Sequence, residues 1–224
     1  MSKELVLALN ATELSKLGLK PKGLIEFDLA SDPDNLNYAL LPRHTADDKS
    51  IPSLTLGMMY PQILGYFQVV NEHGRILTYQ RKGKEKGLLG KWSIGVGGHV
   101  SQEDLFDLHQ HSGDTYPTLT ELVYAGALRE FKEELGIDLT HSVNIGGIDD
   151  FTTQATKLLY SVTDPTSMCH VGVPMSIELD DFTTAEGLTL DPAEFNNITW
   201  LTPEELKQSG LDFETWSQLL IENF

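Results

Sequence analysis

Cysteine is nearly absent from this sequence, since Cys169 is the only one in 224 residues. A single thiol cannot close an intrachain disulfide or build a thiolate zinc site, so nothing points to an oxidising compartment. Long apolar runs are also missing: no segment approaches the roughly 18 uninterrupted apolar residues of a membrane span, and the apolar stretch at the N-terminus is too short for a signal peptide. We therefore expect a soluble, cytoplasmic protein with no membrane partner.

Positive charge is scarce as well. Sixteen Lys and Arg residues stand against 33 Asp and Glu residues, which gives a formal net charge of -17. Such a surface repels the phosphate backbone of a nucleic acid duplex, so duplex partners are not expected. A small phosphate-containing molecule remains a candidate partner, because a bound divalent cation in a carboxylate-lined site can attract an anion.

The length and a hydrophobic content of 40% suit one domain with additions better than two independent domains. Residues 1–60 are interpreted as an N-terminal extension packed on the core, and residues 61–224 as the principal domain. Residues 101–117 are polar and contain Gly113 and Pro117, so we interpret them as an inserted loop with at most a short helical turn.

Strand and helix patterns alternate along the chain. A hairpin is predicted from two β-runs joined by Asn71 to Gly74, and the last strand before residue 180 is predicted to be an edge or interrupted strand because it contains Pro174. The other predicted elements are strands at 5–9, 24–29, 63–70, 76–80, 92–100, 143–148, 157–163, 170–179 and 198–201, and helices from Thr12, from Pro203 with Thr202 as cap, and over 212–224. This order predicts an α/β fold with a mixed β-sheet between helices.

The clearest element is a helix over residues 119–135. Leu122, Ala125, Leu128, Phe131 and Leu135 recur at spacings of three and four, which predicts one apolar helix face. Thr118 or Thr120 is a suitable N-terminal cap, and Gly136 stands where a glycine in the left-handed conformation would end the helix.

Three carboxylates lie on neighbouring turns of this helix. Glu130 precedes Glu133 by three residues and Glu134 by four, which places their β-carbons within ~5–6 Å of one another. Like charges at this spacing repel and raise one another's pKa values unless a cation neutralises them. Hard cations such as Mg2+ prefer carboxylate and carbonyl oxygens, and a glycine turn at Gly97 and Gly98 can bring a backbone carbonyl close.

Arg129 stands four residues before Glu133 and eight after Glu121, so it can orient carboxylates through charge-assisted hydrogen bonds. A helix rich in Glu, Lys and Arg is more often only a solvated surface. The glutamate triplet, the arginine, the Gly-Ile end, the upstream glutamate and the preceding glycine turn together favour a site.

From Glu121 onward, these residues resemble the Nudix hydrolase signature at every required position: Glu121, seven residues, then Arg129, Glu130, Phe131, Glu133, Glu134, Gly136 and Ile137. This sequence departs from the signature at its start. Thr115 stands where the signature has its glycine, and the Gly97-Gly98 pair lies more than twenty residues before Glu121. An insertion corresponding to residues 101–117 reconciles the two.

The resemblance extends over residues 60–210. Within these residues, the sequence is similar to a bacterial and phage subgroup of phosphoesterase-like Nudix proteins. The resemblance implies a Nudix-type α/β/α sandwich that hydrolyses a diphosphate (pyrophosphate) linkage, in a nucleoside diphosphate derivative or a related small molecule, with Mg2+ or Mn2+. By the same resemblance, Glu133 and Glu134 are the main metal ligands, Gly98 adds a carbonyl, and Glu130 is a further ligand or the base that activates water. Arg129 would orient these groups, with Glu186 or Glu194 as an additional acid.

Arg81 directly follows a predicted strand and His99 follows the glycine pair, so both are candidates for substrate binding. The alternative for Arg81 is a solvated hairpin loop. A histidine at a strand end is more often a structural hydrogen-bonding group.

Two other functions on the same scaffold were weighed. Isopentenyl diphosphate isomerases need a catalytic cysteine just before a Gly-His pair, and Gly97 occupies that position here. A non-catalytic ligand-binding or regulatory protein usually lacks one or more signature glutamates, whereas all are present here. The substrate and a homodimeric state stay open.

Overall fold

The structure is a computed structural model, and it describes residues 4–9, 22–27, 38–43, 60–82, 87–112, 117–136, 157–163, 167–179 and 191–224. The predicted helix from Thr12, the predicted strand at 143–148 and the candidate acid Glu186 lie outside the described residues.

One mixed sheet joins the described strands, with the order β10-β5-β4-β9-β8-β2 along its main path. Strand β4 runs parallel to β9 over its full length and antiparallel to β7, and most other pairings are antiparallel. The strands are β1 Leu5–Leu9, β2 Lys22–Glu26, β3 Tyr38–Pro42, β4 Gln62–Asn71, β5 Ile76–Arg81, β6 Trp92–Ser93, β7 Val96–His99, β8 Lys157–Ser161, β9 His170–Leu179 and β10 Phe195–Leu201.

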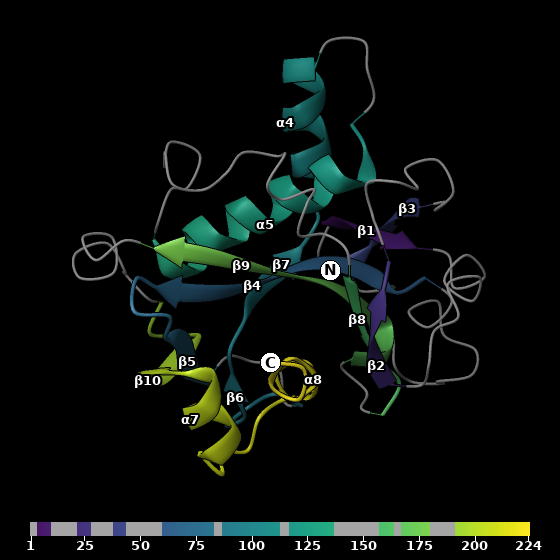
Figure 1. Ribbon diagram of the computed structural model, residues 1–224. Coiled ribbons are helices and arrows are strands. Elements are labelled where there is room, and N and C mark those ends of the chain that lie inside the picture. The colour runs from purple at the N-terminus through teal and green to yellow at the C-terminus, as the bar shows by residue number, and fades with distance from the viewer. Residues whose placement is uncertain are drawn as a thin grey trace.

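Helices cover both faces of this sheet (Figure 1). Helices α4 (Gln102–Ser112) and α5 (Leu119–Leu135) lie on one side, and α7 (Pro203–Gln208) and α8 (Thr215–Ile221) lie on the other. One apolar cluster fills the α5 side around Phe67 and Phe131, and a second fills the α8 side around Tyr66 and Trp216. The expected α/β fold with a mixed sheet between helices is confirmed.

The first strands of the chain belong to this same sheet. Strand β1 pairs with β3 over five residues and meets β4 at Ala8 and Gln62. The backbone N–H of Leu7 donates to the carbonyl of Val100 at 2.8 Å, which ties β1 to the segment just before α4. Strand β2 pairs with β8. The strand predicted at 5–9 is confirmed, and the one predicted from residue 24 begins at Lys22.

The interpretation of residues 101–117 as a loop is wrong over most of its length, because α4 occupies Gln102–Ser112. Local hydrogen bonds start this helix: the Asp104 carboxylate accepts from the N–H of Ser101 at 2.7 Å, and the Ser101 hydroxyl accepts from the N–H of Glu103 at 3.2 Å. These bonds satisfy N–H groups that a helix start leaves without helical partners.

The prediction of an edge or interrupted strand at 170–179 is correct in one respect and wrong in the other: β9 is not interrupted, but beyond Gly172 its only described partner is β4. Strand β9 pairs with β4 along its whole length and has β8 as its neighbour on the other side, and Pro174 is buried in it. The pairing with β8 consists of Leu159 and Gly172 alone. Beyond Gly172 a missing N–H on that side therefore breaks no described strand pairing, and the proline is tolerated.

Smaller differences concern element ends. The strand predicted at 92–100 is two short strands, β6 and β7, and the last helix is shorter than 212–224. The hairpin of β4 and β5 and the Thr202-capped helix α7 are confirmed. Among the described helices, none combines the length and the apolar character that crossing a membrane requires.

Candidate active site

Helix α5 carries most of the candidate residues, and its ends are fixed locally. Thr118 and Glu121 form a reciprocal capping box at its start, and Gly136 ends it in the left-handed conformation with φ of 71°. The helix lies close on β4, because a β-carbon added at Gly65 would come within 2.4 Å of the Ala127 β-carbon. Residues 129–134 therefore project from a helix whose position over the sheet is well defined.

Gly98 of β7 lies directly against Glu130. A β-carbon at Gly98 would stand 1.9 Å from the Glu130 Cγ and 2.0 Å from its Cδ, so only glycine leaves space for this carboxylate. The exposed fraction of the Glu130 side chain is 19%. This contact brings a carboxylate and the β7 backbone to one place, as the sequence predicts for Gly98 and Glu130.

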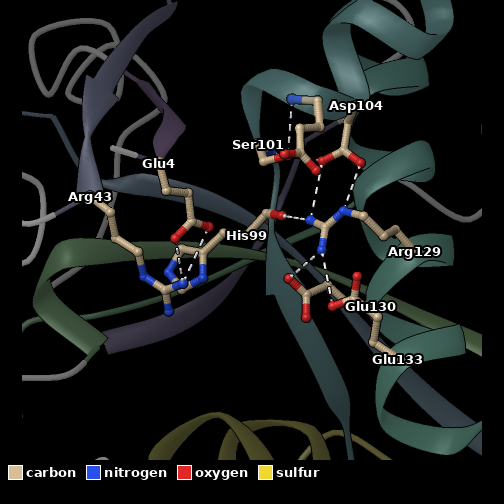
Figure 2. Close-up of polar contacts among 9 residues, drawn as sticks. Glu4, Arg43, His99, Ser101, Asp104, Arg129, Glu130 and Glu133 are labelled. Carbon is tan, nitrogen blue, oxygen red and sulfur yellow. Dashed lines mark hydrogen bonds and ion pairs between the residues drawn. The ribbon is translucent and has the colours of Figure 1, made fainter. Parts of the chain in front are cut away.

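Arg129 forms the centre of a polar network that Figure 2 shows. Its Nε and Nη2 donate to the two oxygens of Asp104 at 2.9 and 3.2 Å, and Nη2 also donates to the His99 carbonyl at 2.7 Å. Its Nη1 donates to Glu130 at 3.0 Å and to Glu133 at 3.5 Å. Arg129 thus contacts two of the three helical carboxylates, while the side chain of Glu133 keeps an exposed fraction of 60%.

Asp104 is the residue in this network that sequence reasoning missed. It lies in α4, within the segment interpreted as a loop, and its side chain is only 4% exposed. The run Ser101-Gln102-Glu103-Asp104 was a usable signal, because Ser followed three residues later by an acidic residue is typical of a helix start. Glu121, the upstream glutamate of the motif, instead bonds to Thr118 at 2.6 and 2.8 Å.

The pKa of Glu130 is raised above its ordinary value, mainly because burial disfavours the charged form. Arg129 acts in the opposite direction, Glu133 adds to the rise, and Arg43 lowers the pKa from the end of β3. Arg43 pairs with Glu4 at 3.1 Å, and this pair lies beside His99 at the edge of the network (Figure 2). The N-terminal segments therefore contribute charged groups near Glu130, which the sequence did not indicate.

The pKa of Glu134 is raised from 4.5 to about 8. Burial is the main cause, Arg81 opposes it, and the charges of Glu130, Glu194 and Asp191 add to it. Glu194, one of the two predicted additional acids, thus lies within electrostatic range of Glu134. The backbone also links these segments, since the N–H of Asp191 donates to the Glu134 carbonyl at 3.1 Å.

The two predicted substrate-binding residues take different positions. Arg81 ends β5. Burial acts to lower its pKa, but its electrostatic interactions, first with Tyr79 and then with Glu134, raise the pKa overall. His99 ends β7, and its ring packs edge-on against His170 with centroids 5.5 Å apart. His99 also serves Arg129 through its carbonyl, so at least one of its roles is structural.

The carboxylates do not converge on one point in this structure. Among the residues that it describes, no group of three or more His, Cys, Asp and Glu residues is arranged to hold a metal ion. Glu130 and Glu133 are turned toward Arg129 instead. The donor types nevertheless suit a hard divalent cation, since Glu130 lies against the β7 backbone at Gly98 and Glu134 shares its surroundings with further anions.

Comparison with known proteins agrees with this architecture. The family model described as NUDIX domain matches residues 59–220. The crystal structure of Tm1382, a provisionally assigned Nudix hydrolase, aligns with 98% of this chain and 100% of its own at 19% identity and a TM-score of 0.62, a likeness in fold.

Two further structures align less closely. DR0079 from Deinococcus radiodurans covers 89% of this chain and 98% of its own at 17% identity and a TM-score of 0.46. The NUDIX domain of Shewanella oneidensis NrtR, crystallised with ADP ribose, covers 81% and 95% at 11% identity and a TM-score of 0.44. No curated protein matches the sequence.

Proposed function

The chain belongs to the NUDIX domain family and is a hydrolase of the pyrophosphate type, and from that premise we propose that it cleaves the diphosphate linkage of a nucleoside diphosphate derivative or a related small molecule with the help of Mg2+ or Mn2+. The observation that carries this proposal is the contact between α5 and β7. Glu130 lies against Gly98, where any side chain would displace it, and Arg129 contacts both Glu130 and Glu133.

A divalent cation suits the charges at this place. The pKa values of Glu130 and Glu134 are raised by burial and by neighbouring carboxylates, so additional positive charge would stabilise their ionised forms. We propose that Glu130, Glu133 and Glu134, with the Gly98 carbonyl, hold this cation. Once bound, the cation would polarise the diphosphate and lower the pKa of bound water.

The remaining roles, those of the base, the residue that orients it and the additional acid, belong to side chains of this protein. Glu130 is the better candidate for the base, because it is largely buried and held by Arg129, whereas Glu133 is mostly exposed and contacts Arg129 only at 3.5 Å. Arg129 orients Glu130 through a charge-assisted hydrogen bond. We propose Glu194 as the additional acid, because its charge lies close enough to Glu134 to raise the pKa of that residue.

Arg81 and His99 remain the proposed substrate contacts. A guanidinium near Glu134 can bind a phosphate oxygen, and the imidazole of His99 extends from the end of β7, the strand whose Gly98 lies against Glu130. We further propose that residues 1–60 form an extension packed on a domain of residues 61–224 that acts on a small phosphate-containing molecule. A cytoplasmic location and a homodimer stay predictions.

The first experiment tests turnover. Purified protein is assayed with Mg2+ or Mn2+ against nucleoside diphosphate derivatives, dinucleoside polyphosphates and NADH. Glu133→Gln should nearly abolish hydrolysis without unfolding the protein, because it removes a carboxylate charge from the proposed cation site. Glu204→Gln is the matched control, since Glu204 is an exposed carboxylate at the start of α7 on the other side of the sheet.

The outcomes separate the candidate functions. Wild-type rates in Glu133→Gln would remove Glu133 from the mechanism. No turnover of any compound by the wild-type protein, together with tight binding of one of them, would show a regulatory or ligand-binding protein instead of an enzyme.

A further inference from the structure

Arg43 brings a positive charge from the N-terminal strands into range of Glu130. Strand β1 is tied to the chain that continues β7, since the N–H of Leu7 donates to the Val100 carbonyl at 2.8 Å, two residues after the Gly98 that lies against Glu130. Strand β3 pairs with β1 over five residues, and Arg43 directly follows β3. The charge of Arg43 acts on Glu130, whose pKa it lowers. The guanidinium is therefore within electrostatic reach of the proposed cation site.

The guanidinium of Arg43 is held by a single carboxylate and stays accessible. The backbone N–H of Arg43 donates to the Glu4 carbonyl at 3.0 Å, and its Nη1 donates to the two carboxylate oxygens of Glu4 at 3.1 and 3.3 Å. The exposed fraction of the Arg43 side chain is 40%. Figure 2 shows this pair on the N-terminal strands, with the end of β7 between it and Glu130 in this view. A guanidinium ordered in this way loses less freedom when a ligand binds to it.

Arg129, the arginine in direct contact with the glutamates, has no donor to spare for a substrate. Its side chain donates five hydrogen bonds within the protein, two to Asp104 and one each to the His99 carbonyl, Glu130 and Glu133. A guanidinium has five N–H donors, so these contacts use all of them. Another cationic side chain has to contact the phosphate groups.

Two arginines act on different ends of the glutamate triplet. Arg43 affects Glu130, and Arg81 affects Glu134. The triplet carries up to three negative charges, which exceed the two positive charges of a divalent cation, so phosphate oxygens at this place need additional positive charge. A guanidinium can supply it through two parallel N–H···O bonds.

We propose that Arg43 binds a phosphate group of the substrate at the Glu130 end of the cation site, opposite the contact proposed for Arg81 at the Glu134 end. This inference rests on the proposed function. Glu4 orients the guanidinium from β1. The N-terminal strands therefore contribute directly to substrate binding.

Arg43→Gln tests the proposal through KM. Loss of a hydrogen bond between charged groups costs about 10- to 100-fold in affinity, so KM for the best substrate of the panel should rise by about that factor at constant ionic strength. The kcat at its pH plateau should change little, because Arg43 contacts neither the base nor the attacking water. A shifted acid limb of the kcat profile with an unchanged KM would show that Arg43 acts on Glu130 alone, and would overturn the proposal.

Arg75→Gln is the matched control. Arg75 lies between β4 and β5, its side chain has an exposed fraction of 39%, and it pairs with Glu205 of α7 at 2.9 Å. The substitution removes the same charge from a similarly exposed ion pair, but helix α7 lies on the other side of the sheet from α5 (Figure 1). Both KM and kcat should stay at wild-type values.

Glu4→Gln separates a contact with substrate from support of the fold. It breaks the same ion pair as Arg43→Gln but leaves the guanidinium in place, so KM should rise much less than in Arg43→Gln. Equal rises would mean that the pair only holds β1 and β3 together, and would overturn the proposal.

Arg43→Lys covers the case in which Arg43→Gln does not fold. An ammonium binds phosphate as a point charge but lacks the two parallel donors, so its KM should lie between those of wild type and Arg43→Gln. A wild-type KM in Arg43→Lys would overturn the proposed contact, and so would a KM as high as that of a folded Arg43→Gln.

Methylenediphosphonate, a diphosphate analogue whose bridge is not hydrolysed, gives a readout without turnover. In calorimetric titrations with Mg2+, its Kd should be about 10- to 100-fold higher for Arg43→Gln than for wild type and unchanged for Arg75→Gln. This result without turnover of any compound by wild type would refute the proposed function and support phosphate binding by Arg43. Turnover by wild type with unchanged KM and Kd in Arg43→Gln would overturn this inference alone. Neither binding nor turnover by wild type would overturn both.

Discussion

The pKa of Glu134 lies well above the ordinary value of a glutamate. Its pKa rises from 4.5 to about 8, chiefly through burial, with Arg81 acting against the shift and Glu130, Glu194 and Asp191 adding to it. The folded protein therefore holds this proton more tightly than the unfolded chain does. The resulting stabilisation is fully present below about pH 4.5 and is lost as the pH rises toward 8.

Glu134→Gln should remove that dependence. In the presence of a chelator, the wild-type free energy of unfolding should fall more steeply between pH 4.5 and 8 than that of Glu134→Gln, which has no proton to lose at this position. Urea unfolding at several pH values measures the difference. Glu204→Gln serves as control and should follow the wild-type curve, and parallel curves for wild type and Glu134→Gln would contradict the assignment.

At the residue scale, the sequence predicted the arrangement of residues that lie close together along the chain. Helical spacing placed Glu130, Glu133 and Glu134 on neighbouring turns, and the offset of Arg129 from Glu133 matches their contact at 3.5 Å. Asp104 could not be paired with Arg129 in this way, since 25 residues separate them and the contact exists only because α4 packs on α5.

Among the elements, α8 is attached to the sheet by a buried polar cluster. Glu214 caps α8 by accepting from the N–H groups of Trp216 and Ser217 at 2.8 and 3.0 Å. The Tyr66 hydroxyl of β4 donates to Glu214 at 2.5 Å and contacts the hydroxyls of Ser93 and Ser217 at 3.1 and 2.8 Å. Tyr66 and Glu214 are both buried, so each depends on the other for hydrogen bonding.

Tyr66→Phe should destabilise the protein by about 1–3 kcal/mol, because the buried Glu214 carboxylate loses a donor and water cannot replace it. Chemical denaturation gives the free energy of unfolding. Tyr38→Phe, at a tyrosine of β3 with an exposed fraction of 37%, should change it by less than about 0.5 kcal/mol. Equal effects of the two substitutions would mean that the cluster around Glu214 does not hold α8.

The accuracy of the predicted elements followed how local their signals were. Helix α5 was predicted to its observed bounds, because apolar spacing and both caps lie within its own sequence. For strand β9, Pro174 correctly indicated a strand with one side free of described partners, since Pro174 falls beyond the pairing with β8, but nothing in its residues shows that β4 is its partner along the whole length. The start of α4 was readable in Ser101 and Asp104 but was outweighed by the polar composition of the segment.

Across the whole molecule, the sequence predicted the mixed sheet between helices but not how the N-terminal strands join it. The pairing of β1 with β3 and β4, and of β2 with β8, depends on contacts between segments far apart in the chain. Sequence periodicity carries no information about such partners. The same pairings bring Glu4 and Arg43 to the site, and for that reason these two residues were not among the candidates.

The net charge of -17 should influence catalysis at long range. A substrate with more than two ionised phosphate oxygens, such as a dinucleoside polyphosphate, remains negatively charged even with one bound divalent cation, so the protein's field repels it as it approaches. Monovalent salt screens this repulsion over a Debye length of about 10 Å at 0.1 M. With the divalent cation saturating, kcat/KM should therefore rise by about 2- to 10-fold as KCl increases from ~20 to ~200 mM, mainly through a lower KM.

Steady-state rates on the best substrate of the panel measure this effect, and sucrose at equal osmolality separates screening from changes in water activity. The opposite trend would be equally informative. If kcat/KM fell with KCl, positive groups close to the site, such as Arg43 and Arg81, would outweigh the charge of the whole molecule and attract the substrate from a distance. Arg43→Gln should then reduce the salt dependence, whereas under the expected rise it should leave the slope nearly unchanged, because one charge contributes little to a net charge of -17.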